Sequence, residues 1–510
     1  MISCQIESGV LVRGYNKNVY CWGYSRTEVE NHWSMSWKSR CSQCFVHSVY
    51  YHGSFQICRL ARLLKTPGDS LLSSTVASAP QEFEIACHYP LPYSVGEPGH
   101  LAMGNTSSRS YFPGIKMQPA KTTLFKREQT GTTYRIPALI HLKESQTFLA
   151  FAEKRSSPSD IDAKLIVMRR GTQQNGSTQW SESQELLSAC LPDHRTMNPC
   201  PVYEKNTKTL FLFFICILGN TPEHHQICTG KNKAHLCYIT SNDEGQNWSQ
   251  TKDLTESVIG KTVRRWATFA VGPGHGIQME SGRLIIPTYA YYIHCKCFSF
   301  PFPFTVQPHA LSIYSDDFGQ TWQMGRMLQR KSCECEMAEI IDHEGSSHLY
   351  CNARHRGHRV EALSESSGVY FDKPRLAPRL VEPCHGGCQG SVIGFPAPEQ
   401  GEEGMGGTTL PPLASDTQTW LLFTHPTNKR TRKDLGVYLN RSPLHTSGWD
   451  RPWIVHSGPS GYSDLAYIED TEHFACLMEC GENSELEQIA FVSFPLSDVM
   501  QTVDEKGNTF

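Results

Sequence analysis

A group of metal-binding residue types stands early in the sequence: Cys41, Cys44, His47 and His52. Two thiols and two imidazoles are the ligand set of a structural zinc site. A zinc finger, however, separates its cysteine pair from its first histidine by about a dozen residues, whereas only two residues lie between Cys44 and His47. We therefore predict free thiols and no metal here.

A carboxylate-bearing motif recurs further along the chain. SNDEGQNW (241–248) and SDDFGQTW (315–322) both fit the pattern S-x-D-x-G-x-x-W, and SESSGVYF (364–371) is a partial third copy. In such a segment the aspartate can accept backbone N–H bonds, the glycine can take a positive φ and the tryptophan can pack beneath the turn. We predict that Asp243 and Asp317 stabilise turns and are not catalytic.

The elements around these motifs are short and strand-like. From Phe125 onward, runs such as TFLAFAE, TLFLFFICI and RLIIPTYAYY alternate with clusters of Gly, Pro, Asn and Asp, and amphipathic helices of a dozen residues are scarce. This pattern is typical of all-β proteins. Because the turn motif repeats, repeated four-stranded units are favoured, and a β-propeller is the predicted fold.

The first 118 residues differ from the rest, since they are rich in Pro, Gly and Ser and have few alternating runs. We predict a poorly ordered N-terminal extension and linker over 1–118, one catalytic propeller domain over 119–500 and a C-terminal tail over 501–510.

Composition excludes several classes of protein. The 510 residues include 47 basic and 50 acidic side chains, a net charge of -3, so no global positive field would attract nucleic acid. The longest apolar run, 210–218, is far shorter than the roughly 20 residues of a membrane-spanning helix. The first 30 residues lack the apolar core of a signal peptide. We therefore expect no secretion and mostly reduced cysteines.

The motif TYRIPAL (133–139), together with the two aspartate turns, resembles the sialidase (neuraminidase) family. FAEKR, HRTMNPCP, FAVGPGHGIQ, GCQGSV, DLGVYLN and GYSDLA extend the similarity over 123–495. These motifs are most similar in sequence to those of the animal membrane-associated ganglioside sialidases. The resemblance implies a six-bladed β-propeller of the sialidase type. The implied activity is that of an exo-α-sialidase, a glycoside hydrolase that removes terminal sialic acid with retention and needs no metal or organic cofactor.

Sialic acid carries a carboxylate on its anomeric carbon, and planar guanidinium groups bind such an anion best. Three arginines match the triad of the family: Arg135 in TYRIPAL, Arg354 in CNAR and Arg432 shortly before DLGVYLN. Near the third of these, Lys429, Arg430 and Lys433 are competing assignments.

The same negative charge disfavours a carboxylate nucleophile and favours a neutral tyrosine, which sialidases use. Tyr462 in GYSDLA matches that position. Because a phenol is a poor nucleophile without a base, the family pairs it with a glutamate that matches Glu334. Glu336 and Glu339 are the nearby competitors.

The leaving oxygen needs a proton, and a water must later be deprotonated, so one carboxyl can serve as acid and then as base. Asp160 matches the family's acid/base residue, and Asp162 is the alternative. Weaker matches concern groups around the substrate. Glu479 resembles the glutamate that orients the first arginine, and the residues that resemble the lining of the glycerol and acylamino pockets are Arg155, Met197, Asn198, Glu223, Tyr289, Tyr291 and Gln389.

The expected partners are sialylated glycolipids (gangliosides), glycoproteins and oligosaccharides, and no nucleic acid is expected to bind. The sequence does not indicate the oligomeric state.

Two alternative functions remain open at this point. One is an inactive aspartate-box propeller that only binds glycans or proteins, and the other is a trans-sialidase. The complete set of Tyr, Glu, Asp and Arg residues favours the enzyme over the binding module.

The resemblance also raises the question of how the chain reaches a lipid surface. Phe298, Phe300, Phe302 and Phe304 occupy alternate positions with two interleaved prolines, which predicts a loop or edge. Exposed aromatic residues mark interaction sites, and we hypothesise that these residues contact the bilayer, with Cys295 or Cys297 as acylation candidates. The alternative is that the phenylalanines cover the hydrophobic core of the propeller. The predicted localisation is peripheral at the plasma membrane and endomembranes, with cytoplasmic or lysosomal alternatives.

Overall fold

The computed structural model describes two parts of the chain. The first consists of the backbone of residues 10–15, 18–26, 33–39 and 48–49. The second runs from 119 to 504, apart from 175–176, 298–299, 302–304, 385, 399–417, 446–447 and 470; its side chains are described up to residue 501, except those of 296, 297, 300 and 301. The four residues considered for a zinc site, Cys41, Cys44, His47 and His52, lie outside the described residues, so the prediction of free thiols is not tested here. Most of the phenylalanines between 298 and 304 also lie outside them.

The chain divides into two units, Met1–Ser108 and Arg109–Phe510. The first contains an antiparallel sheet of β1 (Val10–Tyr15), β2 (Asn18–Arg26), β3 (Trp33–Ser39) and β4 (Ser48–Val49). Part of the predicted poorly ordered extension therefore forms strands. Aromatic residues in NVYCWGYSR and WSMSWKS, and the valines of VLVRGY, favour extended backbone.

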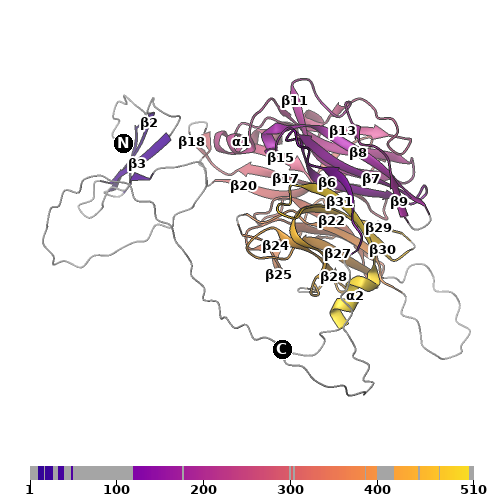
Figure 1. Cartoon of the computed structure of the whole chain (residues 1–510). Helices are drawn as coiled ribbons and strands as arrows, with labels where there is room; N and C mark the ends of the chain where they lie inside the picture. Colours follow the sequence, from indigo (N-terminus) through magenta and orange to yellow (C-terminus); the bar gives the residue numbers. More distant parts are fainter. Residues whose placement is uncertain are drawn as a thin grey trace, which may run out of the picture. The chain divides into compact units, whose positions relative to one another are not determined.

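The second unit is built from antiparallel sheets, so the all-β prediction is confirmed (Figure 1). Four sheets are separate from one another. The first contains β6 (Thr133–Leu142), β7 (Thr147–Arg155), β8 (Ala163–Gln174), β9 (Ser177–Trp180) and β10 (Gln184–Glu185). The second contains β11 (His194–Glu204), β12 (Thr209–Leu218), β13 (Ala234–Ser241) and β14 (Lys252–Asp253). The third contains β15 (Trp266–Val271), β16 (Ile277–Gln278), β17 (Leu284–Ile293), β20 (Val306–Ser315) and β21 (Gln323–Met324). The fourth contains β22 (Cys335–Ile341), β23 (Ser347–Ala353), β24 (His358–Ser364) and β25 (Arg375–Val381).

The remaining large sheet has seven strands. These are β26 (Ser391–Pro396), β27 (Thr419–Pro426), β28 (Lys433–Asn440), β29 (Trp453–Ile468), β30 (His473–Cys480), β31 (Gln488–Pro495) and β5 (Thr122–Lys126). Apart from a two-stranded ribbon, the pairing in the described part of this unit therefore gives four separate sheets and one continuous seven-stranded sheet, not the six separate blades predicted. The physical reason is the 16-residue strand β29, which pairs with β28 through its first half and with β30 through its second half.

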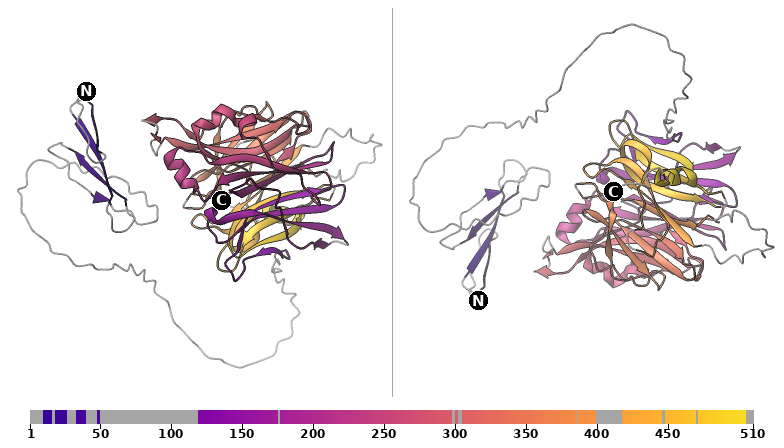
Figure 2. Two further views of the ribbon diagram at one scale, coloured as in Figure 1. Left: turned by 90° about the horizontal axis from the view of Figure 1, so that it is seen from above. Right: turned by 90° about the horizontal axis from the view of Figure 1, so that it is seen from below.

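Short elements complete the unit. They are a two-stranded ribbon of β18 (Lys296–Cys297) and β19 (Phe300–Pro301), the short 3₁₀ helices η1 (Asp160–Asp162) and η3 (Gly260–Arg265), the short π-helix η2 (Thr255–Ile259), and the helices α1 (Glu223–Thr229) and α2 (Leu496–Asp504). In Figures 1 and 2, α2 lies beside the yellow strands at the end of the domain, and it contacts β28, β29 and β31. No helix among the described residues is long and apolar enough to cross a membrane.

The innermost strands bring distant parts of the sequence together. β6 contacts both β11 and β29, while β22 contacts β26, and β26 contacts β29. β5 is the outermost strand of the seven-stranded sheet. It comes before β6 in the chain but pairs with β31, so it joins the start of the domain to its end. The first strands of the sheets therefore surround a common axis, and residues at their ends can meet there.

The aspartate motifs occupy the same place in three successive sheets: they follow β13, β20 and β24, the third long strand of each sheet, and precede the outermost strand, β14, β21 or β25. Ser241 accepts a bond from Gly245 N at 2.8 Å, and Asp243 accepts one from Asn247 N at 2.8 Å. The second copy repeats these bonds at Ser315 and Asp317. Both motif glycines have positive φ, so the predicted structural role of these turns is confirmed.

Hydrophobic side chains fill the spaces between neighbouring sheets. Trp322 of the second turn motif is 6% exposed and packs against Phe211 and Phe213 of the preceding sheet.

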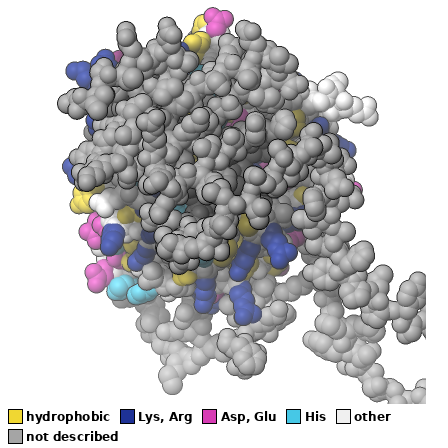
Figure 3. Space-filling view, turned by 90° about the vertical axis from the view of Figure 1, so that its left-hand side faces the viewer, with side chains coloured by type: hydrophobic (Ala, Val, Ile, Leu, Met, Phe, Trp, Pro, Cys, Tyr) yellow, Lys and Arg dark blue, Asp and Glu magenta, His cyan; other side chains and the backbone are white. Residues whose placement is uncertain are grey.

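The surface of the described residues carries both positive and negative side chains. In the coloured part of Figure 3, Lys and Arg side chains lie among Asp, Glu, His and hydrophobic side chains.

Candidate active site

A cavity of about 590 Å³ opens at one end of the axis. Its lining contains every predicted site residue except Gln389 and Glu479. The predicted residues that it brings together are Arg135, Arg155, Asp160, Met197, Asn198, Glu223, Tyr289, Tyr291, Glu334, Arg354, Arg432 and Tyr462. They come from all five large sheets and the loops that follow their strands.

An irregularity in β6 lies next to Arg135, whose side chain lines the cavity. The pairing of β6 with β7 slips between Arg135 and Ala138, and Ile136 has φ 60°, a strained conformation for a β-branched residue. Glu479 stabilises this backbone because it accepts a bond from Ile136 N at 2.9 Å. The same carboxylate accepts bonds from Arg135 Nε at 2.7 Å and Tyr462 N at 3.1 Å. One fully buried glutamate thus holds an arginine and the tyrosine strand together.

The inner strand β11 has a similar irregularity, also supported by a buried carboxylate. The pairing of β11 slips between Met197 and Cys200, Asn198 has φ 58°, and Asn198 N donates to Glu153 Oε1 at 2.7 Å. Glu153 is fully buried and also accepts a bond from Arg155 Nε at 2.8 Å. In both strands a proline follows the residue of positive φ. A buried carboxylate therefore supports each bulge at the cavity end of its strand.

Tyr462 lies at the floor of the cavity and is 7% exposed. Its hydroxyl donates to Glu334 Oε1 at 2.5 Å and accepts from Arg354 Nη1 at 3.0 Å. Burial raises the pKa of Tyr462 well above its usual value; the Glu334 carboxylate raises the pKa further, while Arg354 and Arg432 oppose the shift. The phenol is therefore protonated at neutral pH, and Glu334 lies where it can accept the proton.

Three guanidinium groups surround this tyrosine. Those of Arg135 and Arg432 each lie 5.4 Å from the centre of the Tyr462 ring. Arg354 donates to Glu334 Oε2 at 2.6 Å. The three positive charges next to a neutral phenol form a site for a planar anion.

Asp160 lies across the cavity in η1, with its side chain 64% exposed. Arg155 Nη1 donates to Asp160 Oδ1 at 2.5 Å, and Arg155 itself is held by Glu153. Asp162, the alternative, instead accepts a bond from Ser157 Oγ at 2.6 Å and does not line the cavity. Asp160 is thus the carboxylate of this turn that is open to both the cavity and solvent.

The opposite wall contains Glu223, Tyr289 and Tyr291. Glu223 is open to water in the cavity but protein encloses its other sides; this enclosure, with the Glu334 and Asp160 carboxylates, raises its pKa to about 7. Tyr291 Oη lies 3.8 Å from the Sγ of Cys333, a residue for which the sequence resemblance would suggest an aliphatic side chain. This wall can therefore be neutral or singly charged near neutral pH.

The family model described as a BNR repeat-like domain matches residues 146–474. "Sialidase-3" of Bos taurus is 51% identical over 407 residues, which cover 76% of this chain and 95% of that protein. "Sialidase-4" of Mus musculus is 40% identical, with 76% and 95% covered. The chain belongs to the sialidase family. By that membership it is a glycoside hydrolase.

Solved structures share the fold of this sialidase at low sequence identity. The Hadza microbial sialidase Hz136 aligns with a TM-score of 0.58 and 21% identity, covering 74% of this chain and 69% of that one. The intramolecular trans-sialidase from Ruminococcus gnavus aligns with a TM-score of 0.56 and 14% identity, covering 76% and 99%. At these identities the likeness concerns the fold alone.

Sequence reasoning missed several groups of the sialidase cavity. Glu153 stands in FAEKR, a quoted motif, but its burial behind Arg155 only becomes visible in the folded chain. Arg195, Lys331, His355 and Arg356 also line the cavity. The last three adjoin the motifs around Glu334 and Arg354, so proximity in sequence was the available signal.

Two predicted residues act from behind the lining of the sialidase cavity. Glu479 holds Arg135, as described above. Gln389 is buried and bonds to both backbone groups of Ser463: its Nε2 donates to Ser463 O at 3.0 Å, and its Oε1 accepts from Ser463 N at 3.0 Å. Gln389 therefore supports the residue next to Tyr462 rather than the cavity wall.

The competing assignments lie elsewhere. Glu336 bonds to Gln389 and Val392, and Glu339 lines a different cavity. Lys429, Arg430 and Lys433 are exposed and do not line the cavity that contains Tyr462. Among the side chains described, those that could hold a metal ion by distance are His275, Glu336 and Asp464, outside this cavity.

Proposed function

We propose that the chain is an exo-α-sialidase that hydrolyses terminal sialic acid from gangliosides and other sialoglycoconjugates, with Tyr462 as the nucleophile and net retention. The observation that carries this proposal is the Tyr462–Glu334 hydrogen bond of 2.5 Å within a ring of three guanidiniums. A protein that only bound glycans would not need a paired phenol and carboxylate beneath an anion site.

In the first step the Tyr462 oxygen attacks the anomeric carbon while Glu334 takes the phenolic proton. Asp160 gives its proton to the leaving oxygen, so the departing sugar leaves neutral. In the second step Asp160 takes a proton from water, which attacks the same carbon, and Glu334 returns the proton to Tyr462. Two inversions give retention. Arg135, Arg354 and Arg432 bind the substrate carboxylate throughout.

One experiment tests the function as a whole. Purified full-length protein is incubated with a ganglioside in micelles and, separately, with a soluble sialylated glycoprotein, and the first-formed anomer is followed by NMR. We expect free sialic acid from both, released first as the α-anomer, and faster release from the ganglioside. A β-anomer would contradict the Tyr462 nucleophile, and transfer to an added galactoside without hydrolysis would indicate a trans-sialidase.

The arginine assignment gives a second prediction. Replacing Arg432 with lysine should lower kcat/KM although charge is kept, because an ammonium group cannot reproduce a two-pronged guanidinium contact. Losing one charge-assisted bond costs about 1.5 to 3 kcal/mol, roughly ten- to a hundredfold in kcat/KM. The matched control is Arg430→Lys, which should leave the kinetics unchanged. The reverse pattern would shift the assignment by two residues.

We propose that the seven-stranded sheet represents two blades that share β29, which would make six blades in total. The change of partner between Pro459 and Ser460 supports this division. The catalytic domain would then extend over 119–500, with β5 as the outermost strand of the last blade.

The domain limits can be tested with two truncations. Deleting residues 1–118 should leave a folded and active enzyme, because every proposed site residue lies beyond that point. Deleting residues 1–126 removes β5 and leaves β31 without a partner, so we expect a lower melting temperature and less soluble protein. Equal behaviour of the two truncations, measured by thermal unfolding and hydrolysis, would contradict these limits.

We further propose peripheral membrane contact, at the plasma membrane and endomembranes. It is supported by the aromatic segment around Phe298 and Phe304, whose side chains lie outside the described residues. The comparison of ganglioside with soluble substrate above is also the functional readout for this contact.

A further inference from the structure

A second layer of acidic residues lies beneath the catalytic pair. Along an extended strand, residues two apart point the same way. Asp464 follows Tyr462 at this spacing in β29, and Glu336 follows Glu334 at the entry of β22. Both deeper carboxyl groups are fully buried. His275 joins them, with Nδ1 2.7 Å from Asp464 Oδ1 and 3.8 Å from Glu336 Oε2.

Asp464 connects several inner strands. Its Oδ2 accepts a bond from Leu139 N in β6 at 2.7 Å. Its Oδ1 accepts bonds from Ser391 Oγ in β26 at 2.8 Å and from Leu465 N at 3.1 Å, besides the contact with His275. Every partner named is a donor when the His275 proton is on Nδ1, so Asp464 fixes the positions of β6, β26 and its own strand through these bonds.

Glu336 connects to the nucleophile by a different route. It accepts bonds from Val392 N at 3.0 Å and from Gln389 Nε2 at 3.1 Å, and Gln389 holds both backbone groups of Ser463. Burial, followed by the charge of Asp464, raises the pKa of Glu336 well above its usual value. Burial and the neighbouring carboxylate both disfavour the charged form of Glu336.

These contacts argue against a metal ion, although the ligand atoms of the three groups lie within 4.8 Å of one another. Each carboxylate oxygen already accepts a hydrogen bond from a protein donor. A cation would have to displace these bonds and the His275 proton. The arrangement is suited to fixing backbone positions instead.

We propose that His275, Asp464 and Glu336 are positioning residues that fix the backbone on either side of Tyr462 and so hold its hydroxyl against Glu334. This inference rests on the proposed role of Tyr462 as the nucleophile. Asp464 secures β29 to β6 and β26, and Glu336 secures it through Gln389. A displacement of about 1 Å in this strand would misalign the attacking oxygen, which can cost about a hundredfold in rate.

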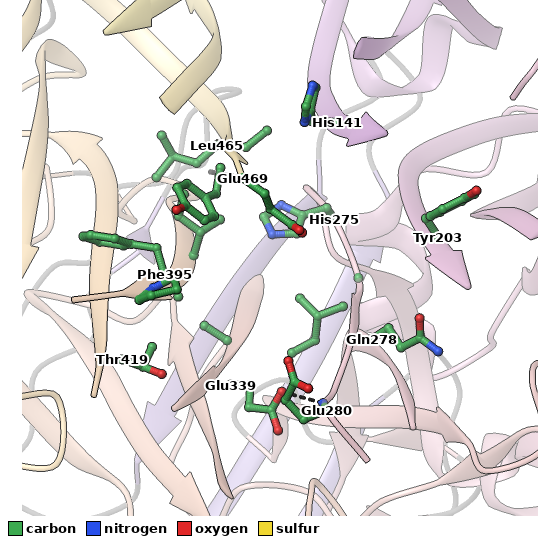
Figure 4. A pocket seen from close by; sticks show the side chains of 18 of the residues that line it. His141, Tyr203, His275, Gln278, Glu280, Glu339, Phe395, Thr419, Leu465 and Glu469 are labelled. Carbon is green, nitrogen blue, oxygen red and sulfur yellow. Dashed lines mark hydrogen bonds between the residues drawn. The ribbon is translucent and has the colours of Figure 1, made fainter. Parts of the chain in front are cut away.

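His275 is the member of this cluster that can be replaced without altering the lining of the active-site cavity. It is 7% exposed and lines a second cavity of about 680 Å³, which the catalytic residues do not line. Figure 4 shows His275 among the labelled side chains of this cavity, with His141 on another strand. A substitution at His275 therefore changes no atom that would touch substrate.

The test compares His275→Ala with His275→Asn. Alanine removes the donor to Asp464, whereas the Asn side-chain nitrogen can take the place of Nδ1. For His275→Ala we expect kcat on a soluble aryl sialoside to fall about ten- to a hundredfold with KM changed less than about twofold. His275→Asn should recover most of kcat. His141→Ala, in the wall of the same cavity, serves as the control and should leave kcat unchanged.

A second measurement separates this inference from the proposed function. A fluorinated sialic acid should label Tyr462 in the wild type, and His275→Ala should be labelled more slowly by the same factor as kcat. If the wild type is labelled on another residue, the nucleophile assignment fails. If Tyr462 is labelled in the wild type but the alanine and asparagine variants have equal kcat and equal labelling rates, the positioning role is overturned.

Should His275→Ala fail to fold, Ser391→Ala replaces it. This variant removes one donor to Asp464 and the acceptor of Leu465 N, with a smaller change in volume. A loss of kcat at constant KM in a protein with unchanged melting temperature supports the positioning role. Unchanged kcat and labelling rate overturn it.

Discussion

Replacing Tyr462 with phenylalanine is expected to abolish turnover, with kcat lower by about three orders of magnitude or more. The change removes one oxygen and barely alters the volume of the side chain. That oxygen accepts from Arg354 and donates to Glu334, so the covalent route is lost while the three guanidiniums remain in place. Binding of a substrate analogue, measured by calorimetry, should persist.

The control for this variant is Tyr438→Phe. Tyr438 is buried in the sheet core and packs against Phe423, outside the catalytic cavity. It should have wild-type kcat. If Tyr462→Phe retained more than a small fraction of wild-type kcat on a natural sialoside, water or another group would have to attack directly, and the covalent mechanism would be wrong.

The second large effect is expected at Asp160, and it should depend on the leaving group. Asp160→Asn should lower kcat/KM on a natural sialoside by about 10² to 10⁴, because the departing sugar oxygen needs a proton. An aryl sialoside has a leaving group that departs without protonation, so kcat/KM for it should fall much less. The measurement is the ratio of the two substrates in wild type and variant.

Asp162→Asn is the matched control, since it changes the same chemical group two residues away. Asp162 bonds to Ser157 rather than lining the cavity, so a modest effect on stability and none on the substrate ratio is expected. A leaving-group dependence at Asp162 and not at Asp160 would transfer the acid role to the former.

The parts of the structure that could be predicted from the sequence are those stabilised by interactions between residues close together in the chain. The turn at 241–248 is stabilised by bonds between residues two to four apart, and the glycine that it needs stands within the motif. Strand-like runs likewise depend on neighbouring residues. The site residues came from family resemblance, because the bonds that assemble them span long distances: Arg135 and Glu479 are 344 residues apart.

What the sequence did not reveal depends on pairing over long distances. Nothing in the segment WIVHSGPSGYSDLAYI indicates that β29 continues from one partner strand to another, since each half reads as an ordinary strand. The cluster of His275, Glu336 and Asp464 was missed for the same reason. Glu336 was considered as a competitor of Glu334, but its burial and its bond to Gln389 depend on a contact 53 residues away.

The closure of the domain by β5 has a consequence for synthesis on the ribosome. β5 is the first strand of the catalytic domain to be made, whereas its partner β31 comes almost last; the bond between Thr123 and Gln488 joins residues 365 apart. At about 5 to 20 residues per second, β5 waits roughly 20 to 70 s for its partner. During this interval an unpaired strand is exposed to chaperones and to neighbouring chains. Closure of the ring is therefore a step that can only follow completion of the catalytic domain, and slower translation would lengthen the period in which the nascent enzyme can aggregate.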